Sequence, residues 1–307
     1  MFFQKYQIRI IKKSKMEYEI KDLNTMQVQQ ILQNSIGPRP IAFASTIDKE
    51  GNPNLSPFSF FNVFSAAPPI LIFSPARRVR DNTTKHTLEN VIEVPEVVIN
   101  VVSYAMVQQT SLSSTEYPKH VNEFEKAGFT AIESDLIQPF RVKESPVQFE
   151  CKVNKVMALG NEGGAGNLIF CEVLKVHIND NILNENKQID PFKLDLVARM
   201  GGNWYCRANG DALFEVEKPL TTMGIGVDAL PHSIRYSPIL SGNDLGKLGN
   251  VETLPNKEEL LSFKDSEEYE ISMQSEVNSD FASHRIAKQL ITDGKTVEAL
   301  KYLLING

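Results

Sequence analysis

The stretch from residue 36 to residue 180 consists mainly of short apolar segments separated by turns, with brief helical patterns between only some of them. Val97 to Val102 is rich in β-branched residues and predicts a buried strand. Val147 to Ala158 and Leu168 to Ile178 predict two longer strands joined by the glycine-rich turn 160–166. The regular alternation of strand and helix that a doubly wound parallel sheet requires is missing. The pattern therefore favours a mainly β fold with α additions, built on a small antiparallel barrel whose closure removes strand edges.

Local signals refine this pattern. Residues 41–46 predict a strand whose odd-numbered side chains face one side and whose even-numbered side chains face the other. Gly51 supplies the positive φ of a hairpin turn over 48–52, and Pro57 predicts a bulge or an edge strand because it cannot donate a ladder hydrogen bond. Helices are expected from His86 to Val94, before Pro95, and over 104–112.

The pattern changes near residue 216. Residues 221–256 predict loops, whereas 257–307 predict helices, with helical spacing over Ala282–Thr292 and Val297–Leu304. The first fifteen residues carry basic groups and no acid, and they lack the long apolar region of a signal peptide, so they are interpreted as a disordered extension. We therefore predict three parts: the extension 1–15, a main domain 16–215, and a loop and helical C-terminal extension 216–307.

Composition excludes several classes of function. The formal net charge is −6 and the pI is near 5.5, which argues against a general nucleic-acid binder. No apolar run reaches the roughly 18 residues needed to span a bilayer, so no membrane partner is expected. Cys151, Cys171 and Cys206 form no CxxC pair and favour small core side chains in a reducing cytoplasm, with a redox pair as the alternative. The protein is expected to be cytoplasmic.

Several apparent motifs carry no expected chemistry. Gly224, Gly226 and Ala229 match a loose dinucleotide-binding fingerprint, but only a weak strand precedes them and Pro231 interrupts the helix that the fingerprint requires after them. The glycine run 160–166 lacks the Lys-Ser/Thr of a P-loop and lies between two strands, so it predicts a hairpin turn. The five histidines have no metal-ligand spacing, so no metal site is predicted. No G-x-S-x-G elbow supports hydrolase chemistry.

Residues 38–103 are dense in hydroxyl side chains beside apolar strands. A flavin mononucleotide (FMN) needs an apolar wall for its ring, polar partners for its ribityl chain, and N–H groups, hydroxyls and cations for its phosphate. Lys85-His86-Thr87 stands at the predicted start of a helix, after Arg77, Arg78 and Arg80, and could grip such a phosphate. The alternative is a solvated basic loop in which Thr87 caps the helix.

An ordered set of motifs resembles the flavin-reductase-like family, which includes flavoredoxin. The motifs are Pro38–Thr46 (PRPIAFAST), Gly51–Asn62 (GNPNLSPFSFFN), Pro68-Pro69, Lys85–Leu88 with Asn90, Val98–Ser103, Phe124–Thr130, Glu144–Cys151 and Ala198–Gly202. They span roughly residues 20–207 in the family's order. Where relatives often have Lys-Asp-Thr, this chain has Lys85-His86-Thr87, which leaves any structural role of that carboxylate open.

The resemblance implies a split barrel, bound FMN and a homodimer with each flavin near the subunit interface. By position, Ala44, Ser45 and Thr46 would lie along the ring and ribityl chain. Ser59, Phe60, Phe61 and Asn62 would form the adjoining wall and polar contacts. Lys85 and Thr87 would hold the phosphate, and Asn100 and Ser103 would close the pocket.

The resemblance also implies an oxidoreductase in which no side chain need act as a catalytic acid or base, because the flavin carries the chemistry. The favoured function is an NAD(P)H-dependent flavin reductase that passes hydride to bound FMN and electrons on to an acceptor. One alternative is a non-enzymatic, flavoredoxin-like electron carrier reduced by a protein partner. Another is a cofactor-free structural or binding module on the same barrel.

Overall fold

The computed structural model describes residues 16–274 and 281–306 and divides into two compact units. The first unit ends at Phe214 and the second begins at Glu215. The predicted extension 1–15 lies outside the described residues. Among the described residues, no helix has both the length and the apolar character needed to cross a membrane.

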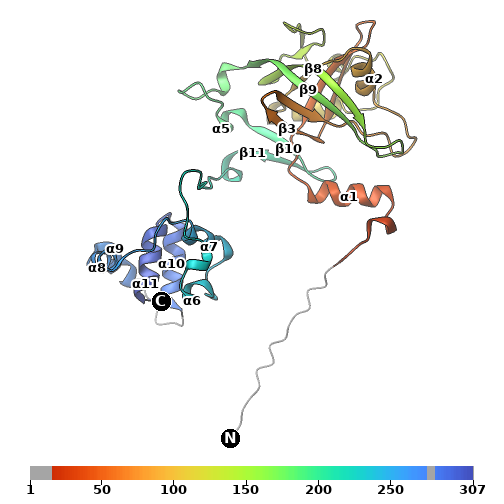
Figure 1. Ribbon diagram of the computed structural model, residues 1–307. Coiled ribbons are helices and arrows are strands. Elements are labelled where there is room, and N and C mark those ends of the chain that lie inside the picture. The colour runs from red at the N-terminus through yellow and green to blue at the C-terminus, as the bar shows by residue number, and fades with distance from the viewer. Residues whose placement is uncertain (1–15, 275–280, 307) are drawn as a thin grey trace. The chain divides into compact units, whose positions relative to one another are not determined.

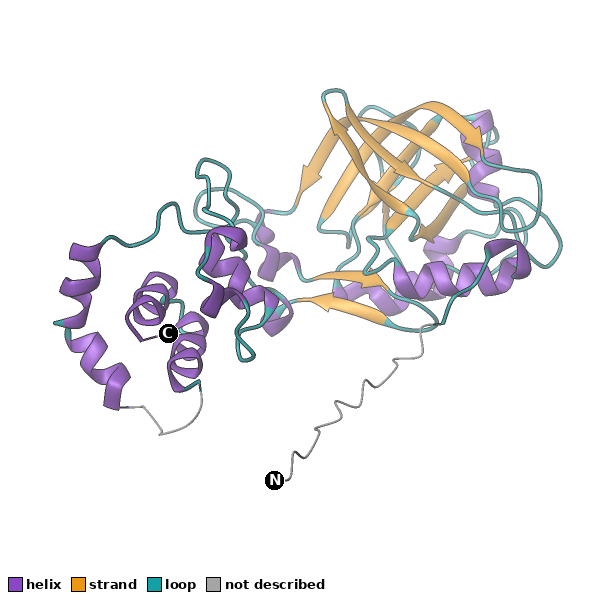
Figure 2. Ribbon diagram, turned by 60° about the horizontal axis from the view of Figure 1, so that its bottom comes forward, coloured by secondary structure: helices purple, strands orange, loops and turns teal. Residues whose placement is uncertain are grey.

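The first unit is built on a seven-stranded antiparallel sheet with the order β2-β1-β5-β8-β9-β4-β3 (Figures 1 and 2). Its strands are β1 (Ala42–Ile47), β2 (Pro53–Phe58), β3 (Phe61–Ala66), β4 (Pro69–Phe73), β5 (Glu96–Asn100), β8 (Val147–Ala158) and β9 (Asn167–Ile178). The antiparallel prediction is confirmed. The sheet is curved and open, with β2 and β3 as its edges, so the described strands do not form a continuously hydrogen-bonded barrel.

Short elements surround this sheet. Two further hairpins pair β6 (Ala131–Ile132) with β7 (Arg141–Val142) and β10 (Leu196–Arg199) with β11 (Tyr205–Ala208). The helices are α1 (Thr25–Ser35), α2 (His86–Glu93), α3 (Val107–Leu112), α4 (Glu123–Ala127) and α5 (Pro191–Leu194), with single 3₁₀ turns at Ile20–Asp22, Tyr104–Met106, Asp180–Ile182 and Gly210–Ala212. The helices predicted over 86–94 and 104–112 are thus confirmed, the second with a 3₁₀ start.

Two apolar clusters lie on opposite faces of β1. Ala42 and Ala44 pack in one cluster, together with the free and buried Cys151 and Cys171, whereas Phe43 packs in the other. This separation confirms the alternation predicted for the strand. It also confirms that these two cysteines are core side chains. Pro57 lies on the edge strand β2, and Gly51 has a φ of 85° in the preceding turn, both as predicted.

The glycine-rich turn 160–166 joins β8 to β9, as predicted. A Cβ on Gly163 would lie 3.1 Å from the backbone of Arg78 and Val79, and one on Gly166 would lie 2.6 Å from the hydroxyl of Ser74. The glycines therefore let the turn approach the loop that follows β4. Gly163 thus allows close approach to a backbone, and Gly166 leaves room for the Ser74 side chain.

The second unit is helical. It contains a 3₁₀ turn (Val227–Ala229), α6 (His232–Arg235), α7 (Gly242–Gly249), α8 (Lys257–Lys264), α9 (Glu267–Gln274), α10 (Ala282–Thr292) and α11 (Thr296–Asn306). Helices in the last part confirm the prediction, but the loop prediction for 221–256 is wrong where α6 and α7 form. The fingerprint-like Gly224 packs against the backbone of Gly249, since a Cβ there would lie 2.6 Å from the Gly249 carbonyl oxygen.

Candidate flavin-binding site

The predicted ring and ribityl residues of β1 are completely buried. Ala44, Ser45 and Thr46 each have no exposed surface, because β1 pairs with β2 on one side and β5 on the other. The Thr46 hydroxyl accepts a hydrogen bond from Asn90 of α2 at 3.1 Å. Ser45 differs: among the described residues its hydroxyl is the one buried side-chain oxygen or nitrogen with no hydrogen-bond partner. An orphaned buried hydroxyl is costly in a folded protein and calls for a partner.

The predicted phosphate residues lie at the start of α2. Lys85 is the N-cap residue, so the alternative in which Thr87 caps the helix is wrong. Thr87 is buried, and its hydroxyl accepts a hydrogen bond from the Asn54 amide at 2.8 Å. The first-turn amides of a helix have no partner within the helix, and the helix dipole favours an anion there. Lys85 and these amides can therefore attract a phosphate, while Thr87 ties α2 to β2.

Three cations lie beside this helix start and share the carboxylate of Glu116. Glu116 lies 3.6 Å from Lys85 Nζ and accepts from Arg78 and Arg80 at 2.9 Å each. Hydrogen bonds from Arg80 and Arg78 lower the pKa of Glu116. Burial, and then the charge of Arg78, lower the pKa of Lys85. Asp81 is a second carboxylate, 3.1 Å from Arg80, so the three cations still outnumber their two acidic partners and the group is suited to a further anion.

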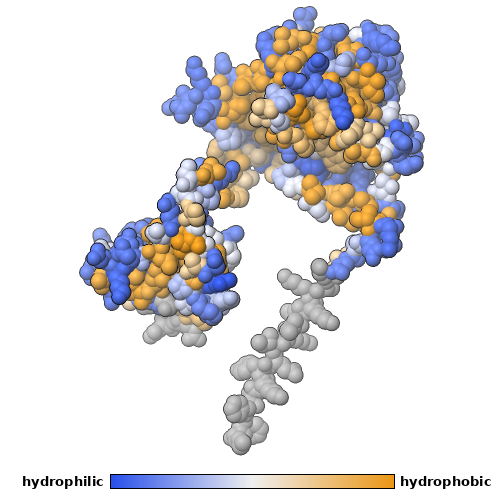
Figure 3. All heavy atoms as spheres, viewed as in Figure 1, coloured by the Kyte–Doolittle hydropathy of each residue, from blue (hydrophilic) through white to orange (hydrophobic). Residues whose placement is uncertain are grey.

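The predicted wall lies at the turn into β3. Phe60 is 40 % exposed and Asn62 is exposed, whereas Phe61 packs against the apolar cluster that contains Ala44. The Asn62 side chain accepts a hydrogen bond of 2.8 Å from the Val63 amide. Ser59 accepts a long, 3.5 Å hydrogen bond from Arg39. Figure 3 shows that hydrophobic residues also lie at the surface of this unit. The turn therefore offers an accessible aromatic face beside hydroxyl and amide groups.

The two residues predicted to close the pocket have structural contacts. Asn100 is fully buried, donates to the Phe43 carbonyl at 3.0 Å and accepts from the Val142 amide at 3.0 Å. Ser103 is half-buried and forms an isolated bridge with Leu196. Asn100 thus joins β5 to β1 and β7, and Ser103 marks the contact between this region and the β10–β11 hairpin.

Sequence reasoning missed three side chains that hold these segments together. Asn54 and Asn90 attach α2 to β2 and β1. Arg39 is buried and donates to the carbonyls of Gln33, Ile36 and Met200 as well as to Ser59. All three lie within or beside the motifs that carry the family resemblance. Those motifs were the sequence signal that could have identified them. Contacts between single pairs of side chains produce no periodic pattern in the sequence. The roles of these three residues were therefore not predicted.

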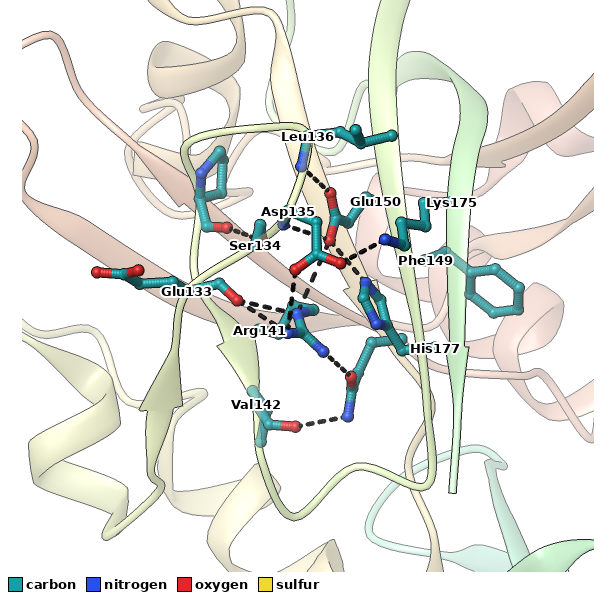
Figure 4. Close-up of polar contacts among 12 residues, drawn as sticks. Glu133, Ser134, Asp135, Leu136, Arg141, Val142, Phe149, Glu150, Lys175 and His177 are labelled. Atoms are coloured by element: carbon teal, nitrogen blue, oxygen red, sulfur yellow. Dashed lines mark hydrogen bonds and ion pairs between the residues drawn. The ribbon is translucent and has the colours of Figure 1, made fainter. Parts of the chain in front are cut away.

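A separate polar cluster fixes the segment 133–142 to the sheet (Figure 4). Glu150 is fully buried and accepts from the amides of Asp135 and Leu136 at 2.8 and 2.7 Å and from His177 at 2.7 Å. Burial alone would raise the pKa of Glu150, but these hydrogen bonds outweigh it and lower that pKa. Asp135, Glu150 and His177 also have the donor types of a metal site. However, Arg141 and Lys175 already contact these carboxylates, and this neutralisation favours an ion-pair network over cation binding.

Comparisons with known proteins identify the first unit. The model of the flavin reductase like domain matches residues 35–193. An uncharacterized protein of Aquifex aeolicus is 37 % identical over 201 residues, which make up 66 % of this chain and all of the relative. Component B of nitrilotriacetate monooxygenase from Bacillus cereus is 27 % identical, with a TM-score of 0.62 over 66 % of this chain and 99 % of that chain.

A Shewanella frigidimarina protein described as a flavin reductase with a split barrel domain is 25 % identical, with a TM-score of 0.55 over 66 % of this chain and all of that one. The family match covers about half of the chain and includes every residue predicted to contact FMN. This chain therefore belongs to the flavin-reductase-like family.

Proposed function

We propose that the first unit is a split barrel that binds FMN and acts as an NAD(P)H-dependent oxidoreductase. The observation that carries this proposal is the orphaned Ser45 hydroxyl, which lies on β1 within the region that the family model matches. A buried polar atom without a partner is expected where a ligand completes the hydrogen bonding. The cation-rich start of α2, which packs on the Ala44 and Thr46 face of β1, independently supports a cofactor that carries a phosphate, as FMN does.

The described residues fit the separate parts of FMN. Lys85 and the first-turn amides of α2 would hold the phosphate, with Thr87 positioning the helix through Asn54. Ser45 and Ser59 would supply hydroxyls for the ribityl chain, and the exposed face of Phe60 would supply an apolar wall. When bound, FMN supplies reversible two-electron chemistry between a nicotinamide nucleotide and an acceptor. The protein's part is to bind, orient and surround the cofactor with fixed dipoles, without a catalytic acid or base.

We propose a homodimer as well, with the β3 edge as part of its interface. This edge strand exposes Val63 and Phe64, each more than 60 % accessible, next to Phe60. Exposed apolar edge strands promote pairing with another chain and are normally covered. Replacing Phe64 with Lys should therefore shift the full chain from dimer to monomer in analytical ultracentrifugation. A wild-type chain that sediments as a monomer at all concentrations would contradict the dimer.

The function is tested by the visible spectrum of the purified full chain before and after anaerobic addition of NADH or NADPH. A flavin band that bleaches with either nucleotide supports the reductase. A flavin band that bleaches only with a chemical reductant identifies the electron carrier instead. A colourless protein whose melting temperature does not rise with added FMN would refute flavin binding, because a ligand of the native state must stabilise it.

A further inference from the structure

A cavity of about 340 Å³ lies within the first unit, and its lining includes none of the residues predicted to contact FMN. Its wall includes Tyr104, Gln108, Ser111, Arg199, Tyr205 and Arg207. Two of these residues come from α3, one from the 3₁₀ turn before it, and three from the β10–β11 hairpin. Ligand sites typically have volumes of about 300–1,000 Å³, so this cavity is large enough for a small molecule or a mononucleotide.

The cavity contains two guanidinium groups, and they differ in how they are neutralised. Arg207 pairs with both oxygens of Asp195, at 2.7 and 2.8 Å. Arg199 donates to the Trp204 carbonyl at 3.1 Å, and within the described part of the chain no carboxylate lies within ion-pair distance of it. Its charge also lowers the pKa of the nearby Arg39, after the larger effect of burial. Arg199 therefore leaves the cavity with an excess of positive charge.

Each guanidinium also lies over an aromatic ring. The Cζ atom of Arg199 is 4.6 Å from the ring centroid of Tyr205, and that of Arg207 is 3.9 Å from the centroid of Tyr104. Such stacking fixes the plane of a guanidinium. The edge of Arg207 is taken by Asp195, whereas Arg199 keeps donors for hydrogen bonds to a carboxylate or phosphate. The flat surfaces of guanidinium and tyrosine favour a planar ring in the ligand.

Backbone contacts link the lining of the cavity to residues predicted to contact FMN. Tyr104 follows Ser103 directly, and its amide donates to the Asp195 carbonyl at 2.9 Å. Arg199 and Arg39 exchange backbone hydrogen bonds of 2.8 and 3.0 Å, and the Arg39 side chain reaches Ser59. The cavity is therefore connected to two residues predicted to surround FMN.

We propose that this cavity binds a flat aromatic anion, that is, an aromatic ring carrying a carboxylate or a phosphate. Arg199 holds the anionic group, and the stacked side chains contact the ring. Such a ligand would serve as the second substrate of the flavin centre. That role rests on the proposed function, whereas binding of the ligand in the cavity does not. The size of the cavity limits the part of the ligand that it can hold to about the size of a mononucleotide.

The test is calorimetric titration of the FMN-saturated full chain with two probes, adenosine monophosphate and benzoate. Binding of at least one probe is expected, and the probe that binds shows whether phosphate or carboxylate is preferred. Arg199→Gln should weaken that binding roughly tenfold to a hundredfold, because a charge-assisted hydrogen bond is lost. Tyr205→Leu, which keeps both charges, should weaken it less and provides a second variant if Arg199→Gln does not fold.

Arg235→Gln is the matched control, because Arg235 stacks on Tyr236 in the second unit at 5.5 Å. It should leave probe affinity unchanged. Flavin content, read from the absorbance of the same samples, should be equal in all variants. Failure of both probes to bind a flavin-loaded protein would overturn this inference and leave the proposed function standing. Loss of flavin in Arg199→Gln would also overturn it, since the cavity would then be part of the flavin site. Probe binding by a chain that takes up no FMN would instead refute the proposed function.

Discussion

Ser45 and Ser145 are two buried serines with opposite hydrogen-bonding states. Ser145 is 2 % exposed, and its hydroxyl lies 2.8 Å from the carbonyls of Val101 and Val147. Ser45 is fully buried, and its hydroxyl has no partner among the described residues. Residues of the same type and burial therefore make opposite contributions to stability, and a ligand that hydrogen-bonds to Ser45 would make its hydroxyl favourable.

Ser45→Ala should accordingly leave the flavin-free protein as stable as the wild type, or more stable by about 1 kcal/mol, while weakening FMN binding. The control Ser145→Ala should destabilise the protein by about 1 kcal/mol without a specific loss of FMN affinity. Melting temperatures and fluorescence titrations with FMN would measure both effects. Equal FMN affinity in the wild type and Ser45→Ala would remove Ser45 from the site.

Lys85→Met should weaken FMN binding about tenfold, because the phosphate loses a charged donor. Lys85 is part of no apolar cluster, so the fold should remain. Lys49→Met, in the exposed turn before β2, is the control and should bind FMN normally. Titration at low and high salt adds a second criterion, since the difference between Lys85→Met and wild type should shrink as salt screens the charge.

Some of the site's residues could be located from the sequence, but their contacts could not. The motifs identified the segments that contain Ser45, Lys85 and Asn100. The hydrogen bonds that fix α2, such as Asn54 to Thr87, join positions that are distant in the chain and follow no periodicity. Charge alone likewise did not reveal that Glu116 gathers the cations near α2.

At the scale of elements, strands with strong alternation and β-branched content were predictable, and β8 has the predicted bounds. Helix α7 was not predicted, because its sequence GNDLGKLG contains three glycines with low helix propensity. Its stability comes from a capping box between Ser241 and Asp244 and from the burial of Leu248 in the core of the second unit. Tertiary packing therefore outweighed local propensity there.

The segment 133–142 is held to β8 and β9 mainly by Glu150. Glu150→Gln should remove the charge that Arg141 and His177 contact and destabilise the attachment by about 3 kcal/mol at neutral pH. Hydrogen exchange should show faster exchange of the Asp135 and Leu136 amides. Lys175→Gln is a milder comparison, because Lys175 contacts the exposed Asp135 and not the buried carboxylate.

The pH dependence follows from the lowered pKa of Glu150. A carboxyl with a folded-state pKa below its unfolded value contributes stability that is complete above the unfolded value, about 4.3, and is lost as pH falls through the folded value. The difference in free energy of unfolding between wild type and Glu150→Gln should therefore be constant near neutral pH and shrink below about pH 4. A difference that grew on acidification would contradict this role.

At the scale of the whole molecule, the two compact units have separate cores. The second unit packs Leu248, Ile291, Leu300 and Leu303 together, and all of these residues follow Glu215. The Aquifex aeolicus relative matches only 66 % of this chain over its own full length. We therefore expect the first unit to be an independent folding unit, as the predicted boundary near 215 also implies.

A chain ending at Phe214 should fold, bind FMN with the affinity of the full chain, and lose one thermal transition in calorimetry. Equal flavin content in both proteins is the main readout. A truncated chain that aggregates or fails to take up FMN would show that the helical unit is needed for the first unit's stability.

Arg39 joins segments at both ends of the first unit, since its guanidinium binds carbonyls near residues 33–36 and at Met200. Lysine could not replace it, because an ammonium lacks the planar fork that reaches several acceptors at once. During synthesis, this arginine leaves the ribosome long before its partner at position 200 is made. The first unit should therefore close only after its last hairpin has emerged, and nascent chains stalled before residue 200 should remain sensitive to protease.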